Sequence, residues 1–438
     1  MKMRFLPVFL VFMMTSAHGF SAGGDFASAV ADGSFWKGDY RQQAFFQNAR
    51  YNPVQMGATQ RIRWPAQGFL FCGLPLGEIL VTSDANGKAS RIIAMVYNRG
   101  DDGRVEESEF LARLRNAGSC IEKIIGVPGR NADRKTNPSS QMIDIGGRIW
   151  LGKHSAARLE WSVKPLGARA VPAAEWIRLE LVPMEGNQTV ELLNTKLERT
   201  KVSPKTHVRA NQKGGKEIEG IPMVDQGSKG YCAAASAARL VAYYGLEEID
   251  QNQIAAWAGS DPELGTNPDR MMDGIARVLH DRYRLVARQI DPRLDVQKLF
   301  SLCDRYNQLA RREKRPEVVY AKSGVIDVGE IFAQFNSDLL VKVRCPTPNI
   351  KAIWINKIKK SIDEGIPILW SVYLGLVPEP EIPQASGGHM RLIIGYEDNG
   401  NTIVYSDSWG DRHVRKTMRT EEAIAITTGL RCIAPTLN

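Results

Sequence analysis

Residues 225–236 read Asp-Gln-Gly-Ser-Lys-Gly-Tyr-Cys-Ala-Ala-Ala-Ser. The stretch is a glycine-containing loop followed by a cysteine and a run of small residues. The run from Ala233 to Tyr244 contains no helix breaker and ends at Gly245, so the sequence predicts a helix with Cys232 in its first turn. A helix N-terminus carries unpaired N–H groups and a partial positive charge, which lower the pKa of a thiol. The same N–H groups can face an oxyanion, and Gln226 can add a side-chain donor. The stretch therefore predicts a nucleophilic cysteine.

A histidine and an aspartate near the C-terminus can serve as the base and the orienting group for such a thiol. His389 opens an apolar run at 390–396, and Asp407 closes the next apolar run. The turn residues Asp398-Asn399-Gly400 between the two runs predict an antiparallel hairpin, on which the two side chains lie side by side. An imidazole that takes a proton from a thiol needs a third group to fix its tautomer and orientation. We therefore predict that His389 acts on Cys232 and that Asp407 orients His389.

This order of residues resembles the papain-like cysteine peptidase superfamily. Gln226 is followed six residues later by a cysteine, a histidine opens a strand, and residues 407–410 read Asp-Ser-Trp-Gly where most members have Asn-Ser-Trp-Gly. The resemblance is greatest to the bacterial branch of bacteriocin-leader-processing, double-glycine-type peptidases and their extracytoplasmic relatives. In that branch a Gln precedes Cys-Ala-Ala, the helix ends in Tyr-Tyr-Gly, and Asp often replaces Asn. The resemblance covers roughly residues 220–415.

The resemblance implies a function and a set of roles. It implies a thiol-dependent hydrolase that cleaves a peptide or protein substrate through a Cys-His-Asp triad, without a metal or an organic cofactor. Besides the triad, Gln226 would contribute to the oxyanion hole, and Trp409 would shield the His-Asp pair from water. Gly388, just before the histidine, leaves space for a substrate. The alternative, from another class, is a catalytically silent peptide-binding or surface-docking protein on the same scaffold.

Two features depart from the family pattern. Tyr231 precedes the cysteine where many relatives carry a small residue, and the segment from about Arg311 to Ile353 has the character of an insertion. Both could alter access of the substrate. His413 lies close to Asp407 in sequence, but its charged neighbours indicate a solvated strand, so we do not assign it as the base.

The chain of 438 residues predicts two domains of the α+β class after an export segment. Residues 1–22 run from basic through apolar to small residues, as in a secretory signal peptide, and the apolar run is too short to span a bilayer. We expect a secreted, periplasmic or cell-envelope protein without stable membrane insertion. Residues 23–192 predict a mixed α+β domain of unknown role, 193–219 a basic linker, and 220–438 a papain-like domain with helices first and an antiparallel sheet last. A further hypothesis is that the N-terminal domain is a pro-region that blocks the cleft, and the oligomeric state is not indicated.

Composition and the remaining motifs narrow the function further. The net charge of +9 includes Lys2 and Arg4, and much of the remaining excess lies between Lys196 and Lys216. This segment lacks the basic and aromatic interleaving of a nucleic-acid interface, so no nucleic-acid partner is expected. Residues 98–109 partly match a calcium loop, but Gly100 stands where an oxygen ligand belongs, which favours a strand-turn-helix joint. The six cysteines include no C-x-x-C pair, and one economical arrangement pairs Cys72 with Cys120 and leaves Cys232 free. That arrangement would also pair two of Cys303, Cys345 and Cys432.

Overall fold

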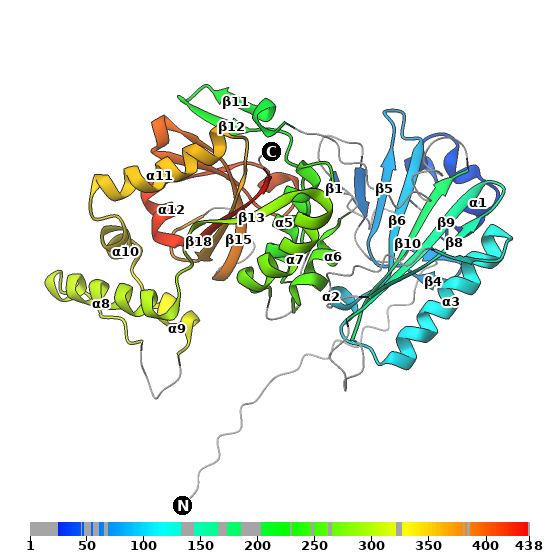
Figure 1. The fold of residues 1–438 in the computed structure, drawn as a ribbon, viewed down its shortest axis with the longest axis horizontal. Helices are drawn as coiled ribbons and strands as arrows, with labels where there is room; N and C mark the ends of the chain where they lie inside the picture. The colour runs from blue at the N-terminus through cyan, green and yellow to red at the C-terminus, as the bar shows by residue number, and fades with distance from the viewer. Residues whose placement is uncertain are drawn as a thin grey trace, which may run out of the picture.

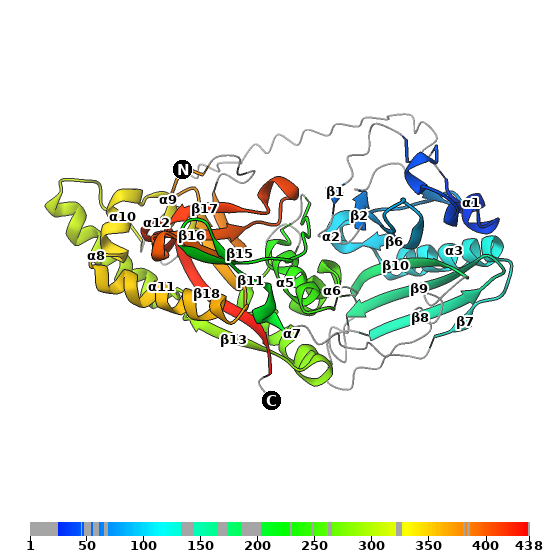
Figure 2. The same ribbon diagram turned by 90° about the horizontal axis from the view of Figure 1, so that it is seen from above.

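The computed structural model describes residues 25–44, 46–47, 54–55, 61–64, 69–132, 144–164, 173–184, 203–227, 230–246, 249–261, 265–320, 326–379, 382 and 386–436. Two antiparallel sheets, each with its own helices, lie in opposite halves of the molecule (Figures 1 and 2). The predicted α+β class is confirmed. The expected signal peptide lies outside the described residues. No helix within the described ranges is both long and apolar enough to cross a membrane.

The N-terminal half is built on a sheet in the strand order β1-β2-β5-β6-β10-β9-β8-β7. Helix α3 packs on β8, β9 and β10, and its C-terminus is capped by Gly126 in the left-handed conformation. Aromatic residues such as Phe26, Phe35 and Trp150 are buried in the core between the sheet and its helices. The strands are β1 (Val54–Gln55), β2 (Arg61–Trp64), β5 (Ile79–Ser83), β6 (Ala89–Asn98), β7 (Arg130–Asn131), β8 (Asp144–Leu151), β9 (Ser155–Lys164) and β10 (Ala173–Pro183), and the other elements are α1 (Ala27–Ala31), η1 (Ser34–Trp36), η2 (Tyr40–Gln42), the β3 (Leu70–Phe71) and β4 (Leu74–Pro75) hairpin, α2 (Arg99–Asp102) and α3 (Glu107–Ile125).

The C-terminal half places helices first and most of its sheet last, as predicted. Its sheet runs β11-β12-β15-β14-β18-β13, and β16 pairs with both β15 and β17. The strands are β11 (Val208–Asn211), β12 (Gly215–Ile218), β13 (Leu285–Asp291), β14 (Ile368–Leu374), β15 (Gly387–Glu397), β16 (Thr402–Ser406), β17 (Lys416–Arg419) and β18 (Thr427–Pro435). The α-helices are α5 (Cys232–Tyr243), α6 (Gln251–Ala258), α7 (Pro268–Tyr283), α8 (Val296–Arg312), α9 (Val328–Ala333), α10 (Ser337–Arg344), α11 (Pro348–Asp363) and α12 (Thr420–Ile426), and short 3-10 turns are η3 (Pro204–His207), η4 (Asp398–Gly400) and η5 (Asp411–His413).

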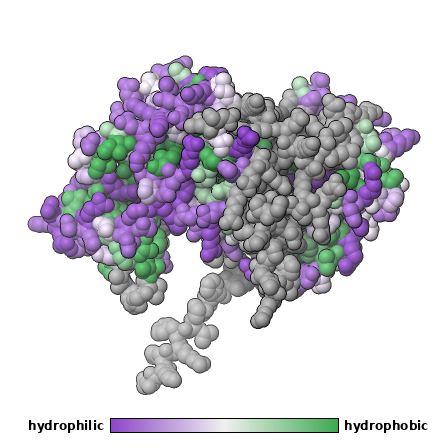
Figure 3. All heavy atoms as spheres, viewed as in Figure 1, coloured by the Kyte–Doolittle hydropathy of each residue, from purple (hydrophilic) through white to green (hydrophobic). Residues whose placement is uncertain are grey.

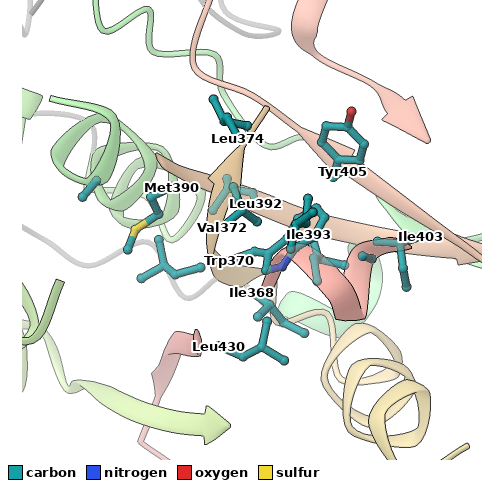
Figure 4. Packing of buried hydrophobic residues seen from close by; sticks show 14 of the residues in the cluster. Ile368, Trp370, Val372, Leu374, Met390, Leu392, Ile393, Ile403, Tyr405 and Leu430 are labelled. Carbon is teal, nitrogen blue, oxygen red and sulfur yellow. The ribbon is translucent and has the colours of Figure 1, made fainter. Parts of the chain in front are cut away.

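The core of this half lies against its central strands. Figure 4 shows Ile368, Trp370, Leu392 and Leu430 among the side chains that fill it. Helix α5 packs on β15, and its alanines are buried because small side chains let a helix approach a sheet closely. On the face seen in Figure 3, the described surface is mainly hydrophilic, with smaller hydrophobic patches.

The predicted basic linker is wrong for its second part, residues 203–219. These residues form η3 and the β11–β12 hairpin, and β12 pairs with β15 through Lys216 opposite Tyr396. At Gly215 a Cβ atom would lie 1.8 Å from the Tyr396 carbonyl oxygen, so the close pairing requires glycine there. The Lys, Asn and Gly content of this stretch suits an exposed hairpin as well as a linker. Residues 193–202 lie outside the described part.

Candidate active site

The predicted nucleophile stands at the first position of a helix. Helix α5 begins at Cys232, with Tyr231 as its N-cap residue. The Ala235 N–H donates to the Tyr231 carbonyl at 2.8 Å, which closes the first turn around the cysteine. Cys232 is partly exposed, whereas residues 233–241, which follow it in the helix, are buried. The cysteine is therefore not fully enclosed, and it lies close to the positive end of the helix dipole.

His389 and Asp407 lie on the predicted hairpin of β15 and β16. The tight connection at Asp398-Asn399-Gly400 is formed by three residues with positive φ angles. His389 Nε2 lies 2.5 Å from Asp407 Oδ1, and both side chains are fully buried. Trp409 stacks on the imidazole, with ring centroids 4.3 Å apart and planes within 10°. Because Asp407 occupies Nε2, the other ring nitrogen, Nδ1, is the atom that can exchange a proton with Cys232.

The charges of these three residues are coupled. Burial alone raises the pKa of Cys232, but attraction to His389 and hydrogen bonds from His389 and the Met390 backbone outweigh it, and the pKa is lowered. Burial lowers the pKa of His389, yet Asp407 and Cys232 reverse this and raise it to about 9. Burial raises the pKa of Asp407, and His389 and Arg391 more than compensate and lower it. The site therefore favours a thiolate beside an imidazolium.

A buried arginine supports the carboxylate from behind, and sequence reasoning missed it. Arg391 Nε lies 3.2 Å from Asp407 Oδ2, and Arg391 Nη1 donates to Glu379 at 2.7 Å. The Tyr405 hydroxyl donates to the same Glu379 carboxylate at 2.5 Å, and the guanidinium carbon lies 4.6 Å from the Tyr405 ring centroid. Arg391 is two residues beyond His389 in an otherwise apolar strand. A charge at such a position signals a buried partner, which could have revealed the network.

A second buried arginine, Arg239 on α5, joins the nucleophile helix to the Asp407 segment. Its Nη1 donates to the Asp407 carbonyl at 2.8 Å, and its Nη2 donates to Ser406 Oγ at 2.6 Å. Its Nε donates to the Pro222 carbonyl at 2.8 Å, just before the nucleophile loop. Burial lowers the pKa of Arg239 to about 10. The side chain was overlooked because one basic residue in an Ala-rich helix is usually solvated.

Gln226 lies where it was expected, beside the same segment. It is 6% exposed, its backbone N–H donates to the Ser408 carbonyl at 2.9 Å, and its side-chain oxygen accepts from Ser408 Oγ at 2.8 Å. These bonds fix the amide through the residue between Asp407 and Trp409. The structure thus brings five of the six predicted site residues into one connected group, with Gly388 next to His389.

Gly388 borders a cavity of about 810 Å³. A Cβ atom at Gly388 would meet no atom within 4 Å, so the space next to the residue is open. The expected insertion, from about Arg311 to Ile353, includes α9 and α10, and α9 forms one wall of the cavity through Phe332, which stacks on Tyr373 at 4.2 Å. At the rim of the cavity, Arg293 is paired with Asp269 at 2.9 Å and Lys298 with Asp295 at 3.1 Å. The positive and negative side chains at the rim are therefore largely balanced.

Three other sequence interpretations can be compared with the structure. The interpretation of His413 as part of a solvated strand is wrong, because it is buried in η5, its ring lies 5.8 Å from that of Trp409, and its carbonyl accepts from the Asp407 N–H at 2.8 Å. All six cysteines fall in the described ranges and none is in a disulfide, so the expected pairing of Cys72 with Cys120 is not found. Burial and a hydrogen bond with Cys72 raise the pKa of Cys120. Within the described ranges no three His, Cys, Asp or Glu side chains are grouped to hold a metal ion. Residues 98–109 form a strand end, α2 and the start of α3, as predicted.

Comparison with known proteins bears on the C-terminal half. Residues 344–426 match the family described as Peptidase_C39 like family, and this segment contains His389 and Asp407 but not Cys232. The predicted relation to papain-like peptidases of this branch is thereby confirmed over the matched residues. A solved structure titled as that of xylellain, a cysteine protease from Xylella fastidiosa, aligns at 13% identity over 56% of this chain and 93% of that chain, with a TM-score of 0.23. No curated protein matches the sequence at a significant level.

Proposed function

We propose that this protein is an exported thiol-dependent hydrolase that cleaves peptide bonds with Cys232 as nucleophile, His389 as base and Asp407 as orienting group. The family match over 344–426 supports a cysteine peptidase-like function in general. The observation that carries the specific proposal is the coupling of the partly exposed Cys232 thiol to a buried His389 that already contacts Asp407 at 2.5 Å. Export is proposed from the sequence pattern of residues 1–22 alone.

In this mechanism the thiolate of Cys232 attacks the carbonyl carbon of the scissile peptide bond. The resulting oxyanion is met by N–H groups at the start of α5 and by the side-chain amide of Gln226. The His389 imidazolium gives its Nδ1 proton to the leaving amine, the C–N bond breaks, and a thioester remains. Neutral His389 then takes a proton from water, which attacks the thioester and releases the acid. Protonated His389 and the Cys232 thiolate are restored together.

The cavity beside Gly388, which includes neither Cys232 nor His389 in its lining, is the proposed place for substrate side chains away from the scissile bond. Its apolar walls, including Val372 and Phe332, favour apolar side chains, because burying each one contributes about 1.5–3 kcal/mol. Trp409, stacked on His389, excludes water from the His-Asp pair, so the imidazolium keeps its orientation through both steps.

The first test is the reactivity of the thiol. The mature protein is exposed briefly to iodoacetamide near neutral pH, and intact mass and peptide mapping locate the label, with Cys232→Ala as the control. We expect rapid labelling at Cys232 and slow labelling at the other five cysteines, and a sharp loss of Cys232 labelling in His389→Ala. A reactive protein is then screened against a peptide library. Slow labelling of Cys232 in the folded protein would reject the peptidase proposal in favour of a peptide-binding role.

A further inference from the structure

The N-terminal half contacts the C-terminal half at the segment that leads to Cys232. In both views of the ribbon, α2 of the N-terminal half lies beside α6 (Figures 1 and 2). Asn98 Nδ2 donates to Asn252 Oδ1 at 2.8 Å, and both residues are buried. Met95 and Trp176 pack on Ala256 in a small apolar cluster. The contact is therefore built from buried groups, both polar and apolar.

Tyr231, the residue before the nucleophile, is at the centre of this contact. Its side chain is only 2% exposed, and it lies directly on Gly100 of α2. A Cβ atom at Gly100 would lie 2.6 Å from the Tyr231 hydroxyl oxygen and 2.7 Å from the ring carbon that carries it. Burial raises the pKa of Tyr231, with the charges of Arg99 and Glu175 close by. A glycine of the first domain thus provides the space that the tyrosine of the second domain fills.

Arg99, next to Gly100, links the same region through an ion pair and hydrogen bonds. Arg99 is 6% exposed, and its Nε donates to Glu175 Oε2 at 3.0 Å within the N-terminal half. Its Nη2 donates to the carbonyl of Ser260, across the interface. Nearby, Arg178 Nη1 donates to Asp250 at 3.3 Å, also across the interface. Because buried charges are costly to leave unpaired, these contacts favour one fixed arrangement of the two halves.

We propose that the N-terminal domain positions the nucleophile, with Tyr231 as the positioning residue that Gly100 and Arg99 hold in place. This inference rests on the proposed function. It explains why a large residue precedes Cys232 where many relatives have a small one. It also gives residues 98–102, at the start of the stretch that partly matches a calcium loop, a role in the active site of the other domain. It opposes the view of this domain as a removable pro-region.

Tyr231 can affect catalysis through the alignment of Cys232 with His389. The lowered pKa of Cys232 depends on its approach to His389, and Tyr231 is covalently next to the cysteine at the N-cap of α5. A misplacement of about 1 Å can reduce a catalytic rate about 100-fold. Displacing the Tyr231 ring should therefore weaken the thiolate-imidazolium pair and leave the substrate cavity, which is lined by other residues, unchanged.

The test compares two glycine-to-alanine variants of the full chain. Gly100 lies within α2, so alanine suits its backbone, and the three atoms nearest to the new methyl group all belong to Tyr231. The matched control is Gly118→Ala in α3 of the same domain, where the new methyl would meet its nearest atom at 4.0 Å. For each variant the rate of Cys232 alkylation is measured against pH, together with kcat and KM on a cleaved peptide.

We expect Gly100→Ala to lower kcat by roughly 10- to 100-fold with little change in KM, and to raise the pH at which Cys232 becomes reactive. Tyr231→Ala, which introduces no clash, should act in the same direction, whereas Tyr231→Phe should retain most activity because the ring is kept. Circular dichroism identifies a misfolded variant, in which case Tyr231→Ala decides. A reactive wild type with Gly100→Ala and Tyr231→Ala both unaffected overturns this inference alone. An unreactive Cys232 in the wild type overturns the proposed function and this inference with it.

Discussion

At the scale of single residues, the coupled charges of Cys232 and His389 set a pH window for activity. The active pair requires an ionised thiol, whose pKa is lowered, and a protonated imidazole, whose pKa is raised to about 9. Activity should therefore fall in acid, as the thiolate gains a proton, and fall in alkali through about pH 9, as the imidazolium loses its proton. A bell-shaped profile of kcat/KM is expected. A loss of activity centred near pH 6.5 on the alkaline side would contradict the raised pKa of His389.

The carboxylate of Asp407 stands where most papain-like proteins have asparagine. Asp407→Asn retains an oxygen that can accept from His389 Nε2 but removes the negative charge that raises the pKa of His389. We expect this variant to stay active, with the alkaline limb of kcat/KM moved to lower pH. Asp407→Ala should lose about 100-fold or more, since the imidazole is no longer oriented. Equal losses in both variants would show that the charge, and not the hydrogen bond, is what matters.

Arg391 should be important for stability. It is fully buried between Asp407 and Glu379, so Arg391→Met removes the cation that pairs with Glu379 and leaves Asp407 with His389 alone. Removing one partner of a buried ion pair typically costs 3–5 kcal/mol, so we expect a fall of about that size in the free energy of unfolding, measured with urea. The double variant Arg391→Met, Glu379→Gln should recover part of the loss. As a control, Arg41→Met breaks an exposed pair with Asp39 and should cost less than about 1 kcal/mol.

The proposed catalytic residues could be predicted from the sequence better than the residues that support them. Cys232, His389 and Asp407 each follow or close a recognisable local pattern, and the structure brings them together. Arg239 and Arg391 belong to no such pattern, because their partners lie outside their own helix or strand: the Asp407 carbonyl for Arg239, and the Glu379 and Asp407 carboxylates for Arg391. Only the folded arrangement shows that they are buried. A charged residue inside an apolar strand or an alanine-rich helix is the signal to look for.

At the scale of elements, the start of β15 forms the wall between the histidine and the cavity. Gly388 has open space where a side chain would stand, and its φ angle does not require glycine. We expect Gly388→Leu to extend into this space and raise KM for peptide substrates at least tenfold, while Cys232 alkylation by the small reagent iodoacetamide is unchanged. Gly388→Ala is the matched control and should have a smaller effect. An unchanged KM in Gly388→Leu would place the substrate elsewhere.

The helices and strands that were predicted correctly are those with a clear local signal, either a tight turn or a run of helix-favouring residues. The hairpin of β15 and β16 was predicted because Asp398-Asn399-Gly400 adopts positive φ angles readily, and α5 because alanine favours a helix. The β11–β12 hairpin was missed because its strands are short and polar. Its place in the sheet depends on β15, which lies far along the chain. Pairing of this kind is a tertiary effect that local composition does not encode.

At the scale of the whole molecule, the contact between the two halves should couple their unfolding. Trp176 is 2% exposed and packs on Met95 and on Ala256 of the other half. We expect calorimetry to show one main transition for the wild type, and Trp176→Ala, which removes the largest side chain of this cluster, to separate it into two. The exposed variant Arg41→Met should retain a single transition. Two transitions in the wild type would mean that the halves unfold independently.

The relation between the halves could not be predicted from the sequence. Residues 98–109 were interpreted as a joint within one domain, and Tyr231 as an unexplained departure within the other. Each observation was correct locally, and their contact through Gly100 became visible only in the folded chain. Interfaces between domains follow from complementary shapes, which have no periodic signature in sequence.

The nucleophile and its base are supplied by distant parts of the chain. His389, Arg391 and Asp407 lie on one hairpin, whose contacts are local and can form early, whereas Cys232 must be brought in across most of the C-terminal half. Until that closure the thiol lacks its imidazolium neighbour and behaves as an ordinary cysteine. A chain carried unfolded to another compartment would therefore travel without a reactive sulfur. If the protein is an exported hydrolase, as proposed, its thiol would become reactive only where the chain folds.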